Sequence, residues 1–412
     1  MKKTPYINAM NILIFMTGGF DNHGPSNHLY GSLIEDFLSA GNKVHLIESL
    51  STGKNPSLPI QLANKSNLTY ELVKSKLVQK NKFAQRYLNS LIYSYKSRKA
   101  LKKSGKPDIV LIQSCPTAFF QLNSVKRFFD CPIVYNIQDM FPGSSIYSGI
   151  MRKKWMQTFF YALQKKAYKK ADHITVISED SKTKLLEQGV SNEKISVIVN
   201  WYDDKSVHEI EWAENRFVAK YNLQQNKFYI QYAGTMGFVF DFDKIIQTAV
   251  ALQKYSNIEF HMIGEGSQKA QFIRKAQQLN LSNIRFFPLE PQDMVSDVYS
   301  SCSIQLIPLK RGIIGNSVPS KAALLMACRR TIVNSVDENS DYYNMFNREN
   351  IGIAVSNIST PDLVKVILKL YQNDSVRVTL AENGQRYGAL HYSRSVNTKK
   401  YINLFETLIK EK

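Results

Sequence analysis

A stretch near residue 310 combines the residue types that bind phosphate groups. Ile304–Ile307 is predicted to be a buried strand, two glycines follow it in a loop, and a helix is predicted to open near Pro319. Proline suits the first turn of a helix, where its missing N–H costs nothing. Free N–H groups and the dipole at a helix start attract anions. The glycines and cations of the stretch are Gly312, Gly315, Lys310, Arg311 and Lys321. The stretch predicts an anion site, and the alternative is an ordinary strand-to-helix junction with solvated cations.

Other candidate residues lie in loops that follow predicted strands. Gly234–Gly237 resembles half of a dinucleotide-binding loop and Gly264–Gly266 is a second tight turn, although such short glycine patterns are weak signals when they stand alone. His23 lies in the first such loop, where a lone histidine is more often incidental than catalytic. Asp139 follows a strand and is either a site acid or a helix cap. The sequence has no Walker lysine, nucleophile elbow or zinc-ligand spacing.

Alternating strands and helices must position these loops. The predicted strands of the first half are Asn11–Thr17, Lys43–Glu48, Ile109–Gln113, Ile133–Ile137, Ile174–Ile177 and Ile195–Val199. Those of the second half are Tyr229–Ala233, Ile258–Ile263, Ile284–Phe287, Ile304–Ile307, Thr331–Asn334 and Ile351–Val355. Continuous apolar strands are typical of parallel sheets buried on both faces. We therefore expect two tandem Rossmann-like, doubly wound α/β domains, with ligands at the strand ends and in a cleft between the domains.

The domain boundary is predicted from composition. Residues 1–200 are expected to form the N-terminal domain and residues 201–392 the C-terminal domain, with the polar stretch Tyr202–Asn215 between them. Residues 51–105 are polar and basic, with a helical spacing of apolar residues from Leu77 to Ile92. Helices are predicted to close the chain, and the last one starts at about Ser393.

Length and cysteine usage exclude several classes of protein. A chain of 412 residues is too long for one ordinary core. Its four cysteines have no paired spacing, so a metal or disulfide framework is not expected, and a reducing compartment fits. No run is apolar and long enough for a signal peptide core or a membrane span. A cytoplasmic protein is therefore expected.

Positive charge is concentrated in the first half of the chain. Residues 1–200 have 28 Lys and Arg against 13 Asp and Glu, whereas residues 201–412 have 25 against 21. Eleven basic residues and no acidic one lie between Glu71 and Asp108, and Met151–Lys170 mixes aromatic residues with seven cations. Such a face suits an anionic membrane surface or nucleic acid. No nucleic-acid-binding motif is present, so a membrane surface is favoured, with a solvated basic face as the alternative.

The order of the motifs along the chain resembles glycosyltransferase family 4, and most of all its capsule and exopolysaccharide branch. The similar runs include IVYNIQDMFP, KKAYKKADHITVISEDS, YIQYAGTMGF, IEFHMIGEGS and SVPSKAALLMA, and the resemblance covers nearly the whole chain. It implies the GT-B fold and transfer of a sugar from a nucleotide-diphosphate donor with retained anomeric configuration. It also implies that no metal or other cofactor is required. The last helix, residues 393–412, would cross back onto the N-terminal domain.

The resemblance also implies roles for individual residues. Gly18 and Gly19 would face the donor diphosphate across the cleft, and Asp139 would lie near the acceptor side, with His23 as a second catalytic candidate. Asn200 matches the asparagine that ends the last N-domain strand. The expected donor-binding residues of the C-terminal domain are Gly234, Thr235, Gly237, Gly264, Glu265, Gly266, Lys310, Arg311, Asn316, Ser317, Val318, Pro319, Ser320 and Lys321. No residue is assigned to a metal.

The sequence departs from the family pattern at three places. Asn316 and Leu324 stand where the family usually has two glutamates, and leucine cannot form a hydrogen bond with a ribose. The segment after Gly237 reads Phe-Val-Phe-Asp-Phe where the family usually has Arg and then Lys. Arg329 and Arg330 stand where the family usually has a glycine. Neutralisation of an anion would then depend on Lys310, Arg311 and Lys321.

Together these features predict a hexosyl-type glycosyltransferase of the EC 2.4 class. Its donor would be a UDP- or GDP-linked sugar and its acceptor a lipid-linked glycan for capsule or exopolysaccharide synthesis. The enzyme would act as a peripheral protein on the inner face of the cell membrane, without nucleic acid as a partner. Two alternatives stay open. One is a catalytically inactive GT-B subunit of a glycosyltransferase complex, and the other is a sugar-nucleotide epimerase.

Overall fold

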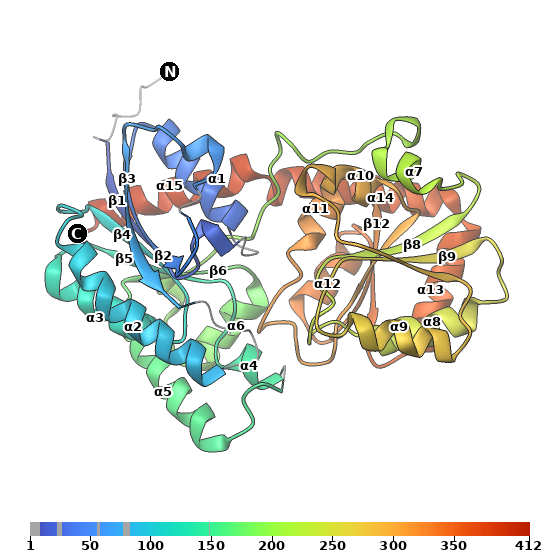
Figure 1. The fold of residues 1–412 in the computed structure, drawn as a ribbon, viewed down its shortest axis with the longest axis horizontal. Coiled ribbons are helices and arrows are strands. Elements are labelled where there is room, and N and C mark those ends of the chain that lie inside the picture. The colour runs from blue at the N-terminus through green and yellow to red at the C-terminus, as the bar shows by residue number, and fades with distance from the viewer. Residues whose placement is uncertain (1–8, 23–26, 56–57, 77–82, 148) are drawn as a thin grey trace. The chain divides into compact units, whose positions relative to one another are not determined.

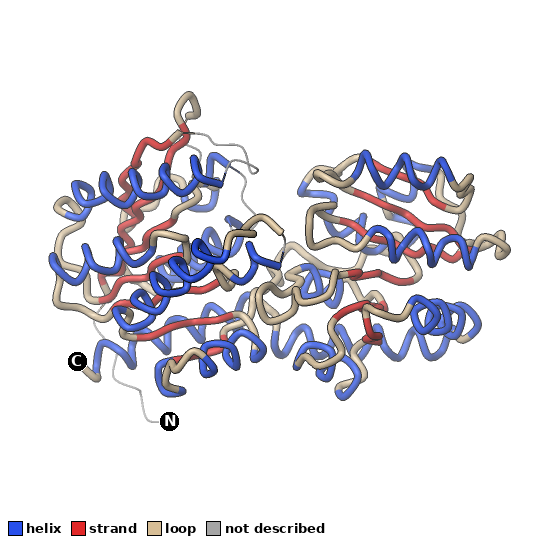
Figure 2. The backbone as a smooth tube through the Cα atoms, turned by 90° about the horizontal axis from the view of Figure 1, so that it is seen from below, coloured by secondary structure: helices blue, strands red, loops and turns tan. Residues whose placement is uncertain are grey.

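The computed structural model describes residues 9–22, 27–55, 58–76, 83–147 and 149–412 (Figure 1). The chain forms two compact units. The first consists of Met1–Val199 with Asn397–Lys412, and the second of Asn200–Val396. Figure 2 shows the strands of each unit as a layer between helices. These two α/β units with parallel sheets confirm the predicted fold class.

The sheet of the first unit is parallel throughout, with the strand order β3-β2-β1-β4-β5-β6-β7. Its strands are β1 (Asn11–Met16), β2 (Lys43–Ser51), β3 (Leu68–Ser75), β4 (Ile109–Gln113), β5 (Ile133–Ile137), β6 (His173–Val176) and β7 (Ile195–Val197). Every residue of β4 and β5 is buried, as expected for strands covered on both faces.

Helices cover both faces of this sheet. They are α1 (Asn27–Ser39), α2 (Phe83–Leu101), α3 (Ala118–Phe128), α4 (Gly143–Tyr147), α5 (Lys154–Lys170), α6 (Glu179–Glu187) and the C-terminal α15 (Arg394–Lys410). Helices α2, α3 and α5 form one layer and contribute to a single apolar cluster with the strands. On α1 and α15, the rings of Phe37 and Phe405 stack with 5.2 Å between centroids.

A buried polar network joins α15 to the first sheet. The Asn136 Nδ2 donates a hydrogen bond of 2.7 Å to the Tyr401 hydroxyl, and the Tyr30 hydroxyl donates one of 2.8 Å to Asn136 Oδ1. Buried amide and hydroxyl groups need such partners because an unsatisfied group is costly. The last residues of the chain therefore form part of the first unit.

The sheet of the second unit is also parallel, with the order β10-β9-β8-β11-β12-β13. Its strands are β8 (Phe228–Ala233), β9 (Ile258–Ile263), β10 (Ile284–Phe287), β11 (Ile304–Pro308), β12 (Thr331–Val336) and β13 (Ile353–Ser356). Its helices are α7 (Arg216–Tyr221), α8 (Phe242–Leu252), α9 (Lys269–Gln278), α10 (Val295–Ser300), α11 (Lys321–Ala327), α12 (Asp341–Arg348), α13 (Thr360–Gln372) and α14 (Asp374–His391).

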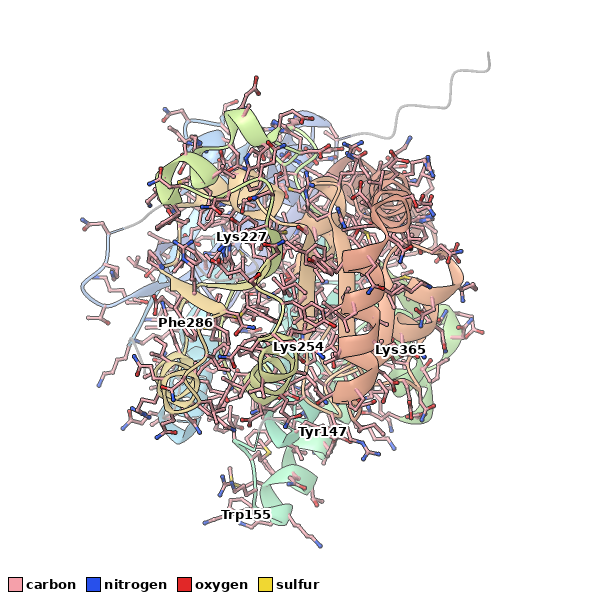
Figure 3. All side chains as sticks on the ribbon, turned by 90° about the vertical axis from the view of Figure 1, so that its right-hand side faces the viewer. Tyr147, Trp155, Lys227, Lys254, Phe286 and Lys365 are labelled. Atoms are coloured by element: carbon pink, nitrogen blue, oxygen red, sulfur yellow. The ribbon has the colours of Figure 1, made fainter. Side chains whose placement is uncertain are left out.

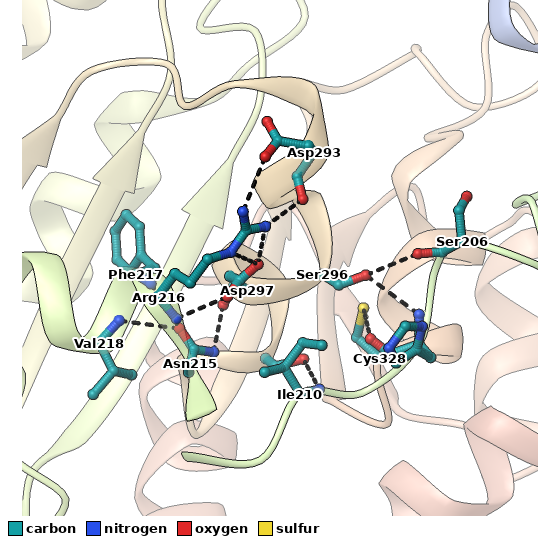
Figure 4. A network of polar contacts seen from close by, with 12 residues as sticks. Ser206, Ile210, Asn215, Arg216, Phe217, Val218, Asp293, Ser296, Asp297 and Cys328 are labelled. Atoms are coloured by element: carbon teal, nitrogen blue, oxygen red, sulfur yellow. Dashed lines mark hydrogen bonds and ion pairs between the residues drawn. The ribbon is translucent and has the colours of Figure 1, made fainter. Parts of the chain in front are cut away.

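The polar stretch before α7 is firmly attached to the second unit (Figure 4). The Asn215 Oδ1 accepts hydrogen bonds from the first N–H groups of α7, and its Nδ2 donates to the Asp297 carbonyl at 2.8 Å. Arg216 forms ion pairs with Asp297 at 2.7 Å and with Asp293 at 2.9 Å. The composition of residues 202–215 resembles that of a linker, but hydrogen bonds to α10 fix much of it in place.

The structure differs from the sequence analysis at three places. Strand β3 lies in the polar and basic region 51–105 and was not predicted, because only Val73 of its eight residues is buried. Helix α12 was not predicted, because only Tyr342, Met345 and Phe346 of its eight residues are buried. The helix predicted to open near Pro319 begins at Lys321. Residue Leu77, part of the helical pattern, lies outside the described residues.

Membrane-spanning segments were not predicted from the sequence. Among the helices of the described residues, none combines the length and apolar character that crossing a bilayer requires.

Candidate functional site

Two loops at the carboxyl end of the second sheet lie directly against each other. One follows β8 and begins at Gly234, and the other follows β9 and begins at Gly264. The Gly234 N–H donates to the Ile263 carbonyl at 2.9 Å, and the Met236 N–H donates to the Glu265 carbonyl at 2.9 Å. The predicted glycine loops are therefore brought together by backbone hydrogen bonds.

Glycine is required where these loops meet. Gly264 has a φ of +130°, and a Cβ there would lie 2.1 Å from the Gly234 carbonyl oxygen. A Cβ on Gly266 would lie 2.3 Å from the Met236 carbonyl oxygen. Only a residue without a side chain allows two backbones to approach so closely. The glycine pattern thus has a packing reason in addition to any ligand-binding role.

Lys321, the first residue of α11, extends to these loops. Its Nζ donates a hydrogen bond of 3.1 Å to the Ala233 carbonyl and lies 3.5 Å from the ring centroid of Tyr232. A Cβ on Gly234 would lie 2.8 Å from this Nζ. The ammonium group therefore lies at the end of β8, beside the first glycine loop.

The charge of Lys321 is poorly compensated. Among the described residues, no carboxylate lies within ion-pair distance of its Nζ. Burial of the ammonium group lowers the pKa of Lys321 to about 7. The ring of Tyr232 offers a cation–π contact, which compensates only part of the lost hydration. A bound anion would supply the missing negative charge, so the site favours a phosphate-bearing ligand.

The loop between β11 and α11 is held by Asp337, at the end of β12. Its Oδ1 accepts a hydrogen bond from the Gly312 N–H at 2.8 Å, and its Oδ2 accepts one from the Ile314 N–H at 3.2 Å. Within the loop, Asn316 Nδ2 donates to the Gly312 carbonyl at 3.0 Å. The side chain of Asn316, which stands at a glutamate position of the family, is thus engaged in loop structure.

Substitution of Asp337 by alanine is expected to loosen this loop. Two backbone N–H groups would lose their acceptor, which costs about 1–3 kcal/mol of unfolding free energy. The dissociation constant of a phosphate-bearing ligand should rise, because the loop would no longer be held in one arrangement. Urea unfolding and calorimetric titration with such a ligand measure the two effects, with Asp337→Asn as the milder control. A stability loss without a change in the dissociation constant would show that the loop lies outside the anion site.

Lys310 lies beside the segment that lacks the usual cations. Its backbone N–H donates to the Val239 carbonyl at 3.0 Å, and its Nζ donates to Gln268 Oε1 at 3.3 Å. The Gln268 side chain also donates to the Gly237 carbonyl. A positive group from the loop after β11 is therefore placed next to the β8 loop, where the family pattern would place Arg or Lys. Arg311 is exposed.

The remaining predicted residues of this unit have structural partners. Glu265 forms an exposed ion pair of 2.6 Å with Lys269. The Thr235 carbonyl accepts a hydrogen bond of 2.7 Å from the Tyr232 hydroxyl, and the Ser317 N–H donates to the Ile313 carbonyl at 3.0 Å. Val318 packs against the main apolar cluster of the unit. Pro319 and Ser320 precede the first residue of α11, and Ser320 makes no side-chain capping bond.

Two departures from the family pattern are explained by burial. Leu324 packs against apolar residues that include Tyr202 and Ala327. Phe240 and Phe242 are buried in the core beside β8, while Asp241 caps α8 by accepting a hydrogen bond from the Lys244 N–H at 3.0 Å. These positions therefore serve the core and the start of a helix, and they supply no cation or ribose acceptor.

Three predicted residues, Gly18, Gly19 and Asp139, lie at the carboxyl end of the sheet of the first unit. Gly18 and Gly19 follow β1, and a Cβ on Gly19 would lie 1.9 Å from the Ser49 carbonyl oxygen. Asp139 follows β5. His23 lies outside the described residues. Asn200 was expected to end a strand, but β7 ends at Val197, and Asn200 opens the second unit with its buried Oδ1 unpaired.

Three positioning residues, Tyr232, Gln268 and Asp337, were not predicted from the sequence. Tyr232 and Asp337 lie at or just after the ends of strands, which is the one signal that could have drawn attention to them. No group of three or more His, Cys, Asp or Glu residues that could hold a metal ion occurs in the part of the chain that the structure describes.

A buried carboxyl group, Glu48, supports the loop after β1. Its Oε2 accepts a hydrogen bond from the Phe20 N–H at 3.1 Å. Burial raises the pKa of Glu48 to about 7, the Phe20 N–H opposes this shift, and the nearby Asp21 adds to it. Near neutral pH this group therefore changes between its protonated and charged forms.

Glu48 should make stability depend on pH. Because its folded-state pKa lies above the unfolded value, the native state binds more protons between about pH 4.5 and about pH 7. The free energy of unfolding should therefore fall as the pH rises through this window, by on the order of 2 kcal/mol. Chemical denaturation across the window should show a flatter profile for Glu48→Gln, whereas the exposed Glu187→Gln should keep the slope. Equal slopes for Glu48→Gln and the parent chain would contradict the assignment.

Comparison with known proteins identifies a glycosyltransferase domain in each half of the chain. The Glycosyltransferase Family 4 model matches residues 27–206, and the Glycosyl transferases group 1 model matches residues 214–387. WcaI of Escherichia coli K12, named for colanic acid biosynthesis, is 28% identical over 167 residues, which cover 40% of this chain and 41% of WcaI. The glycosyltransferase WbjE of Pseudomonas aeruginosa is 23% identical over 281 residues, which cover 66% of this chain and 68% of WbjE.

A solved structure shows the same fold. HepE of Anabaena in complex with UDP superposes with a TM-score of 0.75 at 12% identity, and the match covers 97% of this chain and 100% of HepE. At this identity the likeness concerns the fold alone. The two family models place a Glycosyltransferase Family 4 domain and a Glycosyl transferases group 1 domain in succession along the chain. The chain is therefore a glycosyltransferase with a family 4 domain in its first half and a group 1 domain in its second half.

Proposed function

We propose that this protein transfers a sugar from a nucleotide-diphosphate donor to a lipid-linked glycan acceptor, with retained anomeric configuration, in the synthesis of a cell-surface polysaccharide. The observation that supports this most is the position of Lys321. Its ammonium group, without a carboxylate partner among the described residues, lies beside the Gly234 loop at the end of β8. A leaving diphosphate bound there would meet a positive charge in a site of low polarity.

The transfer would depend on stabilising the leaving group. The acceptor hydroxyl oxygen forms a bond to the anomeric carbon while the bond from that carbon to the diphosphate breaks, and the hydroxyl proton passes to a diphosphate oxygen. Lys321, Lys310 and the amides of the glycine loops would stabilise the developing negative charge, an effect of the oxyanion-hole type. Asp139 and His23 are proposed on the acceptor side. The nucleotide sugar would be the only co-substrate, and no metal is assigned.

The relatives support the substrate classes. HepE has been crystallised with UDP and with UDP-glucose, so a uridine nucleotide sugar is a reasonable first donor. The name of WcaI refers to colanic acid, an exopolysaccharide, which supports an acceptor in polysaccharide synthesis. We propose that this protein uses the same two classes of substrate, a nucleotide sugar as donor and a growing polysaccharide as acceptor.

The surface of the first unit supports action at a membrane. On α5, the aromatic side chains of Trp155, Phe159 and Tyr161 are 67%, 50% and 41% exposed, and lysines precede and follow them along the helix. Figure 3 shows Trp155 on this helix. Interfacial helices combine exposed aromatic and basic residues in this way. We propose that the protein binds as a peripheral protein to the inner face of the cell membrane.

A panel of UDP- and GDP-linked sugars tests the proposed function. Binding can be measured by calorimetry, and hydrolysis or transfer by release of the nucleoside diphosphate. Saturable binding of one donor, abolished by Lys321→Ala together with Arg311→Ala, is the expected result. Binding of no donor would overturn the proposal and support the alternative of a non-catalytic partner subunit, for which Leu324 in place of a glutamate is the motivating feature.

A further inference from the structure

A pocket in the first unit is lined by residues that the proposed donor site does not include. It has a volume of about 930 Å³ and is formed by β3, the second half of α2 and the end of α3. Strand β3 is the edge of its sheet, so its outer side has no neighbouring strand. The pocket therefore lies beside an edge strand of the sheet.

The lining of this pocket is strongly basic. Its six cations are Lys74, Lys96, Arg98, Lys99, Lys102 and Lys103, and its one carboxylate is Glu71. Lys103 and Glu71 form an ion pair of 3.0 Å, and Arg98 donates a hydrogen bond of 3.0 Å to Ser124 Oγ. Four lysines have no carboxylate partner among the described residues, so the pocket attracts an anion.

Apolar side chains lie between the cations. Ile92, Tyr95 and Phe128 are 38%, 69% and 42% exposed, and Leu72 and Leu91 also line the pocket. Exposed apolar residues clustered within a basic pocket call for a ligand with both an anionic and an apolar part. A free phosphate would use only the cations, whereas a phospholipid headgroup with the first part of its chains would use both.

We propose that the pocket between β3, α2 and α3 binds the headgroup of an anionic phospholipid. The phosphate contacts lysines of α2, and the upper acyl chains contact Ile92, Tyr95 and Phe128. The proposal deepens the membrane association stated under the proposed function, but it does not depend on donor binding. It adds a defined lipid site to a diffuse attraction between a basic surface and a membrane.

Two other occupants fit less well. Single-stranded nucleic acid would use stacked aromatic platforms along a groove, whereas of the pocket's exposed apolar residues only two are aromatic. A second copy of the chain could pair with the free edge of β3, but six cations from each copy would face each other and repel. Charge complementarity therefore favours the lipid.

The experiment uses the full chain with vesicles of phosphatidylcholine, with or without phosphatidylglycerol, and with a soluble short-chain phosphatidylglycerol. Lys99→Ala with Lys102→Ala removes two pocket charges, and Lys254→Ala with Lys365→Ala removes two exposed charges from the second unit (Figure 3). We expect the first pair to weaken binding of phosphatidylglycerol vesicles by about 30-fold. The second pair should weaken it by less than about 3-fold.

A charge-neutral variant separates the pocket from general attraction. Tyr95→Ser with Phe128→Ser keeps every cation and should weaken binding of the soluble lipid by about 10-fold. The thermal shift produced by the nucleotide donor should be unchanged in all these variants. This measurement therefore separates a failure of the lipid-site proposal from a failure of the proposed sugar transfer. Equal losses in both lysine pairs would overturn the lipid site. Competition by single-stranded RNA in preference to lipid, or a dimer lost in the pocket variants, would also overturn it.

Discussion

Replacement of Lys321 by methionine is expected to lower kcat/KM for the sugar donor by at least about 100-fold. Removing one preorganised group that stabilises developing charge typically has an effect of this size. Lys321 has no carboxylate partner among the described residues, and its Nζ lies at the end of β8 beside the first glycine loop. Methionine keeps the length and apolar character of the side chain, so the surrounding packing should be maintained.

The same lysine should couple donor binding to pH. In the free protein its pKa is lowered to about 7, so above neutral pH most molecules hold a neutral amine. A diphosphate favours the charged form, and binding must then take up a proton. Donor affinity should fall between about pH 7 and about pH 9, by up to about tenfold per pH unit. Calorimetric titration in buffers of different ionisation enthalpy would detect the proton that is taken up on binding.

Lys269→Met is the matched control for this substitution. Lys269 lies near the same loops but is paired with Glu265 at 2.6 Å, so its loss should leave kcat/KM within about threefold of the parent value. The Lys321→Met variant should bind the donor with little dependence on pH over the same range. A parent-like rate in Lys321→Met, or the same pH dependence in both proteins, would remove Lys321 from the donor site.

Substitution of Gly264 by alanine is expected to destabilise the second unit by about 3 kcal/mol. The backbone φ of +130° is unfavourable for any residue with a Cβ, and the new Cβ would lie 2.1 Å from the Gly234 carbonyl oxygen. The strained backbone contributes about 1–2 kcal/mol and the steric overlap about 1–3 kcal/mol. Because the clash is with backbone, it can be relieved only by separating the two loops that form the candidate site.

Two alanine substitutions isolate these contributions. At Gly237 the nearest atom to an added Cβ lies at an ordinary 3.5 Å, so the free energy of unfolding should change by less than about 1 kcal/mol. Gly189 has a φ of +81° with open space around it, so its substitution reports the backbone contribution alone. Urea unfolding followed by tryptophan fluorescence measures all three. Equal stability of the Gly264 and Gly237 variants would show that the loops are not in contact.

The sequence was sufficient to predict the two sheets because their strands are continuous apolar runs. Burial on both faces makes β4, β5, β8 and β9 mostly apolar along their whole length, and this pattern is visible without any structure. This pattern is missing from β3, which lies at a sheet edge and has only one buried residue, Val73. The sequence also did not predict the exact start of α11, because the turn from Pro319 continues directly into the helix.

The sequence by itself determined the two-domain α/β class, the glycine loops and the candidate cations, because each depends on residue type and local order. Only the tertiary structure decided which of these residues come into contact with one another. Gly264 is held against Gly234 by the spacing of β8 and β9, and Lys321 reaches the same point from a helix almost ninety residues later. The low pKa of Lys321 likewise results from burial by distant segments, which no local pattern encodes.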